Sequence, residues 1–184
     1  MRITGGSAKG QIIKSPQSVA VRPTTDKVRE AVFSILGAVA SNWDSGLDLY
    51  AGSGALGIEA LSREVGWVDF VDQSSKCCLV IKQNLIKTGF IDKAHVYCCP
   101  VMKAIGFLER SYDMVFVDPP YADNSLSTLI PVLSRSNFIS RDSVILVSHA
   151  SRNILDQQYG SLSKIKEKRY GDTCISIYQK EVAS

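Results

Sequence analysis

Short apolar runs alternate with amphipathic stretches from residue 46 to residue 147, and this alternation constrains the fold more than any other feature of the chain. Each apolar run is about five residues long, and the stretch after it spaces its apolar positions as a helix does. Strands that alternate with helices at this spacing form a parallel sheet with helices on both faces. The sequence therefore predicts an α/β fold with a doubly wound sheet.

The expected elements can be placed along the chain. Strands are expected at 46–50, 67–72, 94–98, 112–117 and 143–147, and helices near 58–62, 74–88, 102–108 and 126–133. An earlier helix is expected to begin at the cap residue Thr25 and to bury a stripe that runs from Val28 to Val39.

Two further pieces are expected at the ends of the chain. Residues 1–14 predict a small β-hairpin outside the main sheet, within an amino-terminal extension that spans 1–20. Residues 165–170 and 175–178 predict a final antiparallel hairpin around Gly171-Asp172. A length of 184 residues fits one domain, 1–184, with this hairpin extension.

Composition excludes several classes of protein. No apolar run approaches the roughly 20 residues that span a bilayer, and the amino terminus lacks the pattern of a signal peptide, so a cytoplasmic protein with no membrane partner is expected. The five cysteines form no C-x-x-C pair and are expected to be reduced and mostly buried. The chain has two histidines, His95 and His149, and no metal site is expected.

A glycine loop follows the first expected strand. The segment 52–57, Gly-Ser-Gly-Ala-Leu-Gly, fits the G-x-G-x-x-G pattern, and Asp72 ends the next strand about twenty residues later. Glycines let a ligand approach the backbone, and a carboxylate at the second strand tip can accept hydrogen bonds from ribose hydroxyls. This pair indicates an adenosine-bearing cofactor, either NAD or S-adenosylmethionine.

The turn Asp118-Pro119-Pro120-Tyr121 favours S-adenosylmethionine. Two successive prolines stiffen the loop after an apolar strand. The Asp118 carboxylate and the Pro119 carbonyl can both accept from one exocyclic amine, and the Tyr121 ring can stack on a nucleobase. Asp48, inside the strand before the glycine loop, would need a cationic partner when buried. The ammonium of S-adenosylmethionine could provide it, and a basic side chain could do so equally well.

Basic residues cluster near the amino terminus. The group comprises Arg2, Lys9, Lys14, Arg22, Lys27 and Arg29. Clustered positive charge is typical of a partner that bears phosphates, and this group is expected to face nucleic acid. A second group of basic residues lies at 164–169. For this group, a face exposed to solvent is as good an interpretation as a nucleic-acid contact.

Four segments together carry a resemblance to a known family. They are the opening Arg2-Ile3-x-Gly5-Gly6-x-x-x-Gly10, the segment Arg22-Pro23-Thr24-Thr25-Asp26 with Val28-Arg29-Glu30, the glycine loop from Ala51 to Gly57, and Asp118 to Tyr121. In this order and spacing they resemble the bacterial 16S ribosomal RNA guanine-N2 methyltransferase family, the D subfamily of small-subunit methyltransferases. The resemblance covers nearly the whole chain.

The resemblance implies a fold, a reaction and a set of site residues. It implies a class I, Rossmann-like methyltransferase with a seven-stranded sheet, S-adenosylmethionine as methyl donor, and a guanine N2 amine of 16S rRNA in the small ribosomal subunit as target. The protein is expected to be a monomer. Asp118, Pro119, Pro120 and Tyr121 correspond to the catalytic turn. The cofactor residues would be Asp48, Tyr50, Ala51, Gly52, Ser53, Gly54, Asp72, Gln73, Val101 and Met102. RNA contacts would come from Arg2, Lys9, Arg22, Thr24, Lys27, Arg29 and Tyr121.

The chain departs from the family pattern at three places. Pro100 stands where an Asp or Asn commonly meets the adenine amino group, so adenine recognition is expected to depend on backbone near Val101. Ser148-His149 stands where the fifth strand often carries a glutamate, and Gln11 replaces a basic residue in the amino-terminal hairpin.

Three alternatives remain open at this point. A methyltransferase that acts on adenine N6 or cytosine N4 would use the same turn chemistry, because both targets are exocyclic amines. An NAD-dependent oxidoreductase would share the glycine loop but leave Asp118 to Tyr121 without a role. A binding module without catalysis is the third alternative.

Overall fold

The computed structural model describes residues 1–16, 25–40, 42–120 and 125–180. Its first half contains α1 (Asp26–Val39), β1 (Ser45–Leu49), α2 (Ala55–Ser62), β2 (Trp67–Asp72), α3 (Ser75–Thr88), a short 3-10 turn η1 (Ile91–Lys93) and β3 (Ala94–Cys98). Its second half contains α4 (Val101–Ile105), β4 (Tyr112–Val117), α5 (Leu126–Arg135), β5 (Ile139–Ala150), β6 (Gln158–Tyr159), β7 (Leu162–Tyr170) and β8 (Thr173–Lys180).

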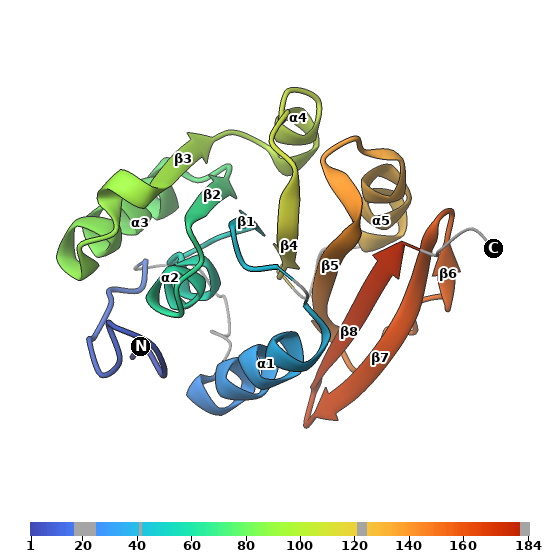
Figure 1. Ribbon diagram of the computed structural model, residues 1–184, viewed down its shortest axis with the longest axis horizontal. Helices are drawn as coiled ribbons and strands as arrows, with labels where there is room; N and C mark the ends of the chain where they lie inside the picture. The colour runs from blue at the N-terminus through green and yellow to red at the C-terminus, as the bar shows by residue number, and fades with distance from the viewer. Residues whose placement is uncertain (17–24, 41, 121–124, 181–184) are drawn as a thin grey trace.

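One mixed sheet organises the molecule (Figure 1). Over the described residues it has eight strands in the order β3-β2-β1-β4-β5-β8-β7-β6. The first five strands in this order pair in parallel, and the hairpin of β7 and β8 adds to β5 in the antiparallel sense. The order reverses between β1 and β4, and such a switch point opens a crevice at the carboxyl ends of the strands, where ligands bind in sheets of this kind.

Two apolar clusters cover the two faces of the sheet. The first cluster includes buried residues of α1, α2 and α3, such as Leu36, Ile58 and Ile81. The second includes residues of α4 and α5, such as Val101 and Leu129. Figure 1 shows the same division, with α1, α2 and α3 on one side and α4 and α5 on the other. The expected doubly wound α/β fold is confirmed.

Most of the expected helix boundaries are correct, because capping residues set them. The Thr25 hydroxyl caps α1 by accepting from the Val28 amide at 3.4 Å, and the Ser74 hydroxyl accepts from the Cys77 amide at the start of α3. Gly89 ends α3 in the left-handed conformation, with φ of 78°. The helix expected at 102–108 is shorter and ends at Ile105, directly before Gly106.

Two predictions about the sheet are wrong. The described sheet has eight strands rather than seven, and the additional strand is β6. The prediction missed it because the two-residue segment Gln158–Tyr159 is too short to show a hydrophobic period. The fifth strand starts at Ile139 rather than Ser143. The prediction missed this start because Ser140, Arg141 and Asp142, which follow the buried Ile139, are polar and half-exposed or exposed and interrupt the apolar pattern. The expected carboxyl-terminal hairpin is confirmed by the pairing of β7 with β8.

The amino-terminal hairpin lies outside the sheet, as expected, but it packs firmly on α2. Its two arms form one bridge, Arg2 with Ile12, and Ile3 donates to the Gln11 carbonyl at 2.9 Å. The side chains of Ile3 and Ile13 are buried in the first apolar cluster. The hairpin is therefore part of the core and not an appendage to it. Of the extension expected at 1–20, residues 17–20 lie outside the described part of the chain.

Candidate active site

The loop after β1 has a backbone that only particular residues adopt easily. Gly52 and Gly54 have φ of 56° and 77°, and Tyr50 has φ of 60° although it is not glycine. Gly54 donates to the Ala51 carbonyl at 2.7 Å, which closes the turn before α2 begins at Ala55. The positive φ at Tyr50 is a strained position for a bulky residue, and such positions cluster at ligand sites.

Asp72 ties this loop to the next strand. One carboxylate oxygen accepts from the Gly52 amide at 2.8 Å, and the other accepts from the Ser74 amide at 2.8 Å. Each carboxylate oxygen can accept two hydrogen bonds, so both keep capacity for a ligand. Asp72 can therefore accept hydrogen bonds from a ligand while it holds the loop, and its contact with ribose stays a prediction.

Asp48 is a buried carboxylate under the same loop. It exposes 1% of its surface, and its Oδ2 accepts from the Gly57 amide in α2 at 2.9 Å. Burial raises the pKa of Asp48 well above its ordinary value, the Gly57 hydrogen bond opposes this, and the negative charges of Asp118 and Asp72 raise it further. A bound cation would favour the ionised carboxylate, so the electrostatics of Asp48 fit the ammonium and sulfonium of S-adenosylmethionine.

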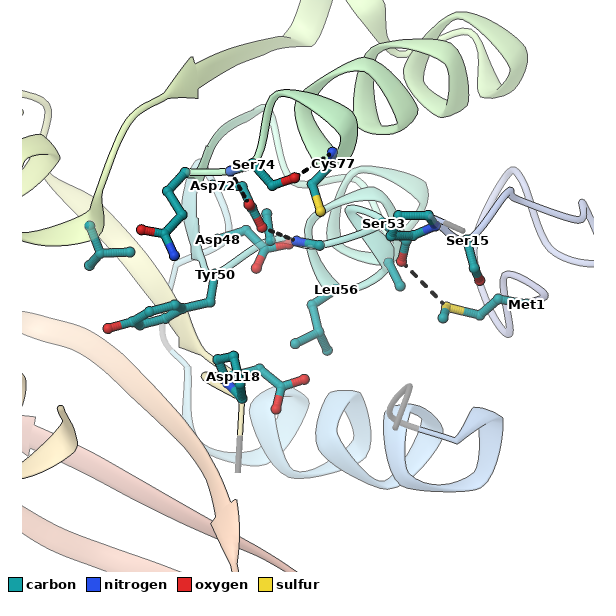
Figure 2. A pocket seen from close by; sticks show the side chains of 17 residues that line it. Met1, Ser15, Asp48, Tyr50, Ser53, Leu56, Asp72, Ser74, Cys77 and Asp118 are labelled. Atoms are coloured by element: carbon teal, nitrogen blue, oxygen red, sulfur yellow. Dashed lines mark hydrogen bonds between the residues drawn. The ribbon is translucent and has the colours of Figure 1, made fainter. Parts of the chain in front are cut away.

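These carboxylates surround a cavity of about 230 Å³ at the carboxyl ends of β1, β2 and β4. Figure 2 shows Asp48, Asp72 and Asp118 around it, from three neighbouring strands. Of the predicted cofactor residues, the lining includes Asp48, Tyr50, Ala51, Gly52, Ser53, Asp72, Gln73 and Val101. Gly54 shapes the loop without lining the cavity, and Met102 also lies outside the lining, with 47% of its surface exposed.

The described part of the predicted catalytic turn, Asp118 to Pro120, lies on the rim opposite the glycine loop. Asp118 and Pro120 line the cavity, and Pro119 is buried beside them. In Figure 2 the Asp118 side chain enters the cavity near Leu56, below the glycine loop. Tyr121, the predicted stacking residue, lies outside the described residues, as do Arg22 and Thr24.

Arg29 was predicted to contact RNA, and this prediction is wrong. Its side chain is fully buried and pairs with Asp26 at 2.8 Å, with the Arg2 carbonyl, and with Glu59 at 3.8 Å. Glu59 is itself fully buried and needs a cation close by. Arg29 is therefore structural: it joins the amino-terminal hairpin to α1 and α2.

The other predicted RNA residues within the described part of the chain are exposed. Arg2, Lys9 and Lys27 all have exposed side chains. In the second basic group, Lys164 is half-buried and bonds to Glu167 at 2.5 Å, whereas Lys166 and Lys168 are exposed. The structure thus separates structural cations, Arg29 and Lys164, from cations that solvent and a phosphate backbone can reach.

The amino-terminal segment contributes cavity residues that sequence reasoning missed. Met1, Ser15 and Pro16 line the cavity, and Ser53 Oγ lies 3.7 Å from Met1 Sδ. In the sequence, Gly6 is the signal that the amino-terminal hairpin packs closely on α2. A Cβ atom added at Gly6 would lie 1.7 Å from the Ser62 carbonyl oxygen and would collide with it. Ala55, Leu56, Ser74 and Cys77 also line the cavity and were not predicted.

Two further groups of side chains could carry chemistry, the cysteines and one possible set of metal ligands. All five cysteines are free thiols; Cys77, Cys78 and Cys174 are buried, as expected, whereas Cys98 is exposed. Among the described residues, His149, Glu167 and Cys174 bring possible metal ligands within 4.8 Å of one another, but the Lys164 ammonium already neutralises Glu167. No helix in the described residues has both the length and the hydropathy that crossing a bilayer requires.

Comparison with known proteins assigns the chain to a family. Residues 1–179 match the family described as Conserved hypothetical protein 95. The chain is 35% identical over 183 residues to YlbH of Bacillus subtilis, covering 98% of this chain and 99% of YlbH. It is 33% identical to ribosomal RNA small subunit methyltransferase D of Escherichia coli over 184 residues, covering 98% and 90% of the two chains.

Solved structures agree with this assignment. The structure of YhhF from Escherichia coli superposes with a TM-score of 0.85 at 31% identity and covers 98% of both chains. The structure of HI0767 from Haemophilus influenzae superposes with a TM-score of 0.80 at 26% identity, over 97% of both chains. The resemblance to the D subfamily is thereby confirmed, and the NAD-dependent alternative is not supported. The chain belongs to the Conserved hypothetical protein 95 family, and it is a methyltransferase that uses S-adenosylmethionine.

Proposed function

We propose that the protein transfers a methyl group from S-adenosylmethionine to the exocyclic N2 amine of a guanine in 16S rRNA. The observation that carries the reaction type is the position of Asp118 on the cavity rim, across from the glycine loop. RNA as the substrate class is supported by the Escherichia coli relative, which is named as a ribosomal RNA small subunit methyltransferase and covers nearly the whole chain. A cytoplasmic location follows from this substrate.

The residues of the cavity have separable roles in this reaction. Asp72 accepts hydrogen bonds from the ribose, and Asp48 lies under the loop where it balances positive charge. When bound, S-adenosylmethionine supplies an electrophilic methyl group with a good leaving group, so the protein chiefly needs to align the nucleophile. Correct alignment of two reactants can contribute about 7–11 kcal/mol to lowering a barrier.

Asp118 addresses the chemical difficulty of the nucleophile. The lone pair of an exocyclic amine is delocalised into the base, so the amine is a weak nucleophile. Hydrogen bonds from the amine to the Asp118 carboxylate and the Pro119 carbonyl favour the geometry in which the lone pair points at the methyl group. Asp118 also accepts the proton that the amine releases. The target base leaves its stack to reach this pocket, which is easiest in loops and bulges of RNA.

One experiment tests the proposal against its alternatives. The protein is incubated with S-adenosylmethionine that carries a labelled methyl group and, in separate reactions, with unmethylated small ribosomal subunits, free 16S rRNA and double-stranded DNA. Digestion to nucleosides and mass spectrometry then identify the product. We expect N2-methylguanosine from the ribosomal substrates. Methyladenine or methylcytosine would contradict the choice of base, and label in DNA alone would contradict the choice of RNA.

A further inference from the structure

Ser148 is a buried serine whose hydroxyl has no hydrogen-bond partner. It lies near the end of β5 and exposes 2% of its surface. Burying a hydroxyl without a partner costs folding free energy, and native chains rarely keep such a group without a reason. Among the described residues, the other buried hydroxyl without a hydrogen-bond partner is that of Tyr170, which lies on β7, two strands further along the sheet.

The strand register places Ser148 beside the catalytic turn. Val117 of β4 pairs with Val147 of β5 in parallel, so Asp118 and Ser148 are the next residues on neighbouring strands. Neighbouring strands are about 4.8 Å apart. Because β4 lies between β1 and β5, Ser148 is on the side of Asp118 away from the glycine loop. This is the side on which a base must lie when its amine faces the methyl donor.

The side chain of Ser148 also projects from the appropriate face of the sheet. Side chains alternate along a strand, so Ser148 shares a face with Leu146, two residues earlier. Leu146 belongs to the cluster that includes α1 and α2, and Ala55 and Leu56 of the same cluster line the cavity together with Asp118. His149 projects to the opposite face, where its ring nitrogens contact the Ala150 carbonyl and Ser176 Oγ.

From these positions we infer that Ser148 Oγ binds the hydrogen-bonding edge of the target base, beside the amine that Asp118 holds. This inference rests on the proposed function and adds a base-contacting residue to it. Next to an exocyclic amine a nucleobase carries either a ring N–H or a bare ring nitrogen. A serine hydroxyl pairs with both kinds of group, because it can donate one hydrogen bond and accept two. The base therefore supplies the partner that the ligand-free protein lacks.

The buried state of Ser148 sets a condition on this contact. The hydroxyl is buried without substrate, so the groups above it must shift when the base enters the site. Entry of the base then recovers the free energy that the unpaired hydroxyl costs the ligand-free protein. A residue of this kind weakens the folded state and strengthens substrate binding, and this combination can be measured.

Ser148→Ala tests the inference, because it removes the hydroxyl and little volume. We expect the melting temperature of the ligand-free protein to rise by about 2–4 °C, since an unpaired polar group is removed. We expect kcat/KM for unmethylated small subunits or 16S rRNA to fall about tenfold, which corresponds to one lost hydrogen bond. The dissociation constant of S-adenosylmethionine, measured by calorimetry, should remain within twofold of wild type.

Ser176→Ala is the matched control. Ser176 is a fully buried serine of the same sheet whose hydroxyl is paired, with His149 at 3.0 Å and with Glu167 at 2.9 Å. Its replacement should lower the melting temperature and leave kcat/KM for RNA within twofold.

Two results would overturn the inference about Ser148. One is an unchanged kcat/KM in Ser148→Ala, and the other is a melting temperature that falls together with the affinity for S-adenosylmethionine. The methylated base that the wild-type protein produces tests the proposed function separately from the inference about Ser148. If the wild type methylates another base, the same comparison on that substrate still tests Ser148.

Discussion

At the scale of single residues, the cavity is characterised by three carboxylates that line it, Asp48, Asp72 and Asp118. Asp72 is held by the amides of Gly52 and Ser74, so its orientation is fixed before a ligand binds. Asp48 is buried with a hydrogen bond from the Gly57 amide and lies within the field of two other carboxylates. Asp118 is half-buried on the rim. The three carboxylates therefore differ in burial and in the groups around them, and the proposed function gives each a different role.

Asp118→Ala should separate catalysis from cofactor binding. We expect methyl transfer to RNA to fall by at least about 100-fold, because the variant loses both an acceptor for the amine and a base for its proton. The affinity for S-adenosylmethionine should change little, since the hydrogen bonds of Asp72 remain. Label incorporation and calorimetry measure the two effects. Turnover like that of wild type would remove Asp118 from the mechanism.

Asp48→Asn should stabilise the ligand-free protein and weaken cofactor binding. The amide oxygen of Asn can still accept from Gly57, while the buried negative charge is gone. We expect a higher melting temperature at neutral pH and about 10- to 100-fold weaker binding of S-adenosylmethionine, because a charged partner is lost. Thermal denaturation and calorimetry test both parts. A variant that melts lower and binds normally would contradict this account of Asp48.

The raised pKa of Asp48 predicts two opposite effects of pH. A carboxyl group whose pKa is raised by burial favours the protonated form in the folded state. Its contribution to stability is complete below the unfolded value of 3.8 and is lost as the pH rises through the folded pKa. Cofactor binding needs the ionised group, so affinity for S-adenosylmethionine should increase over the same pH range. In Asp48→Asn, this part of both pH dependences should disappear.

At the scale of secondary-structure elements, a buried charge network decides how the amino-terminal hairpin meets the helices. Glu59 of α2 accepts from the Thr4 amide at 2.8 Å and from the Thr4 hydroxyl at 2.7 Å. It also pairs with Arg63 at 3.0 Å and lies 3.8 Å from Arg29 of α1. The network holds the hairpin on α2, so that Met1 and Ser15 reach the cavity.

Arg29→Met should destabilise the protein without affecting RNA contacts directly. The substitution keeps an unbranched apolar stem but leaves the buried Glu59 with less positive charge, which we expect to cost about 3 kcal/mol of unfolding free energy. Urea denaturation measures this cost. The double variant with Glu59→Gln should recover part of the loss, because the unbalanced charge is then removed. An Arg29→Met variant as stable as wild type would mean that Arg29 is not needed to balance Glu59.

At the scale of the whole molecule, the proposed function predicts that exposed cations contact the phosphate backbone of RNA. Lys9 lies in the amino-terminal hairpin, whose Met1 lines the cavity, and Lys27 lies in the first turn of α1; both lysines are exposed. Positive charge at such positions attracts RNA and releases the counterions condensed on it. Affinity should therefore depend steeply on salt.

Replacing Lys9 and Lys27 together by Gln should weaken RNA binding and reduce its salt dependence. Each phosphate contact that is lost should make the slope of log affinity against log salt less steep by about 0.7. Filter binding of 16S rRNA over a range of salt concentrations provides the measurement. Lys164→Gln is a suitable comparison, because that lysine is paired with Glu167 and should leave the slope unchanged. Identical slopes in all three proteins would place the RNA elsewhere.

The doubly wound fold, the glycine loop, and the positions of Asp72 and Asp118 at strand ends could all be predicted from the sequence alone. These features depend on local rules: hydrophobic period, capping residues such as Ser74, and the fixed position of loops at strand ends. Such rules act over a few residues, so they can be recognised without knowing which segments meet.

The environments of Arg29, Met1 and Ser148 could not be predicted in this way, because they depend on contacts in the folded protein. Whether a cation faces solvent or a buried carboxylate depends on which element packs against it, and Arg29 meets Glu59 across thirty positions of sequence. Met1 reaches the cavity because the hairpin docks on α2, and Ser148 is significant because its neighbours leave it without a partner. These properties arise from contacts between distant segments, and the pattern of any one segment does not contain them.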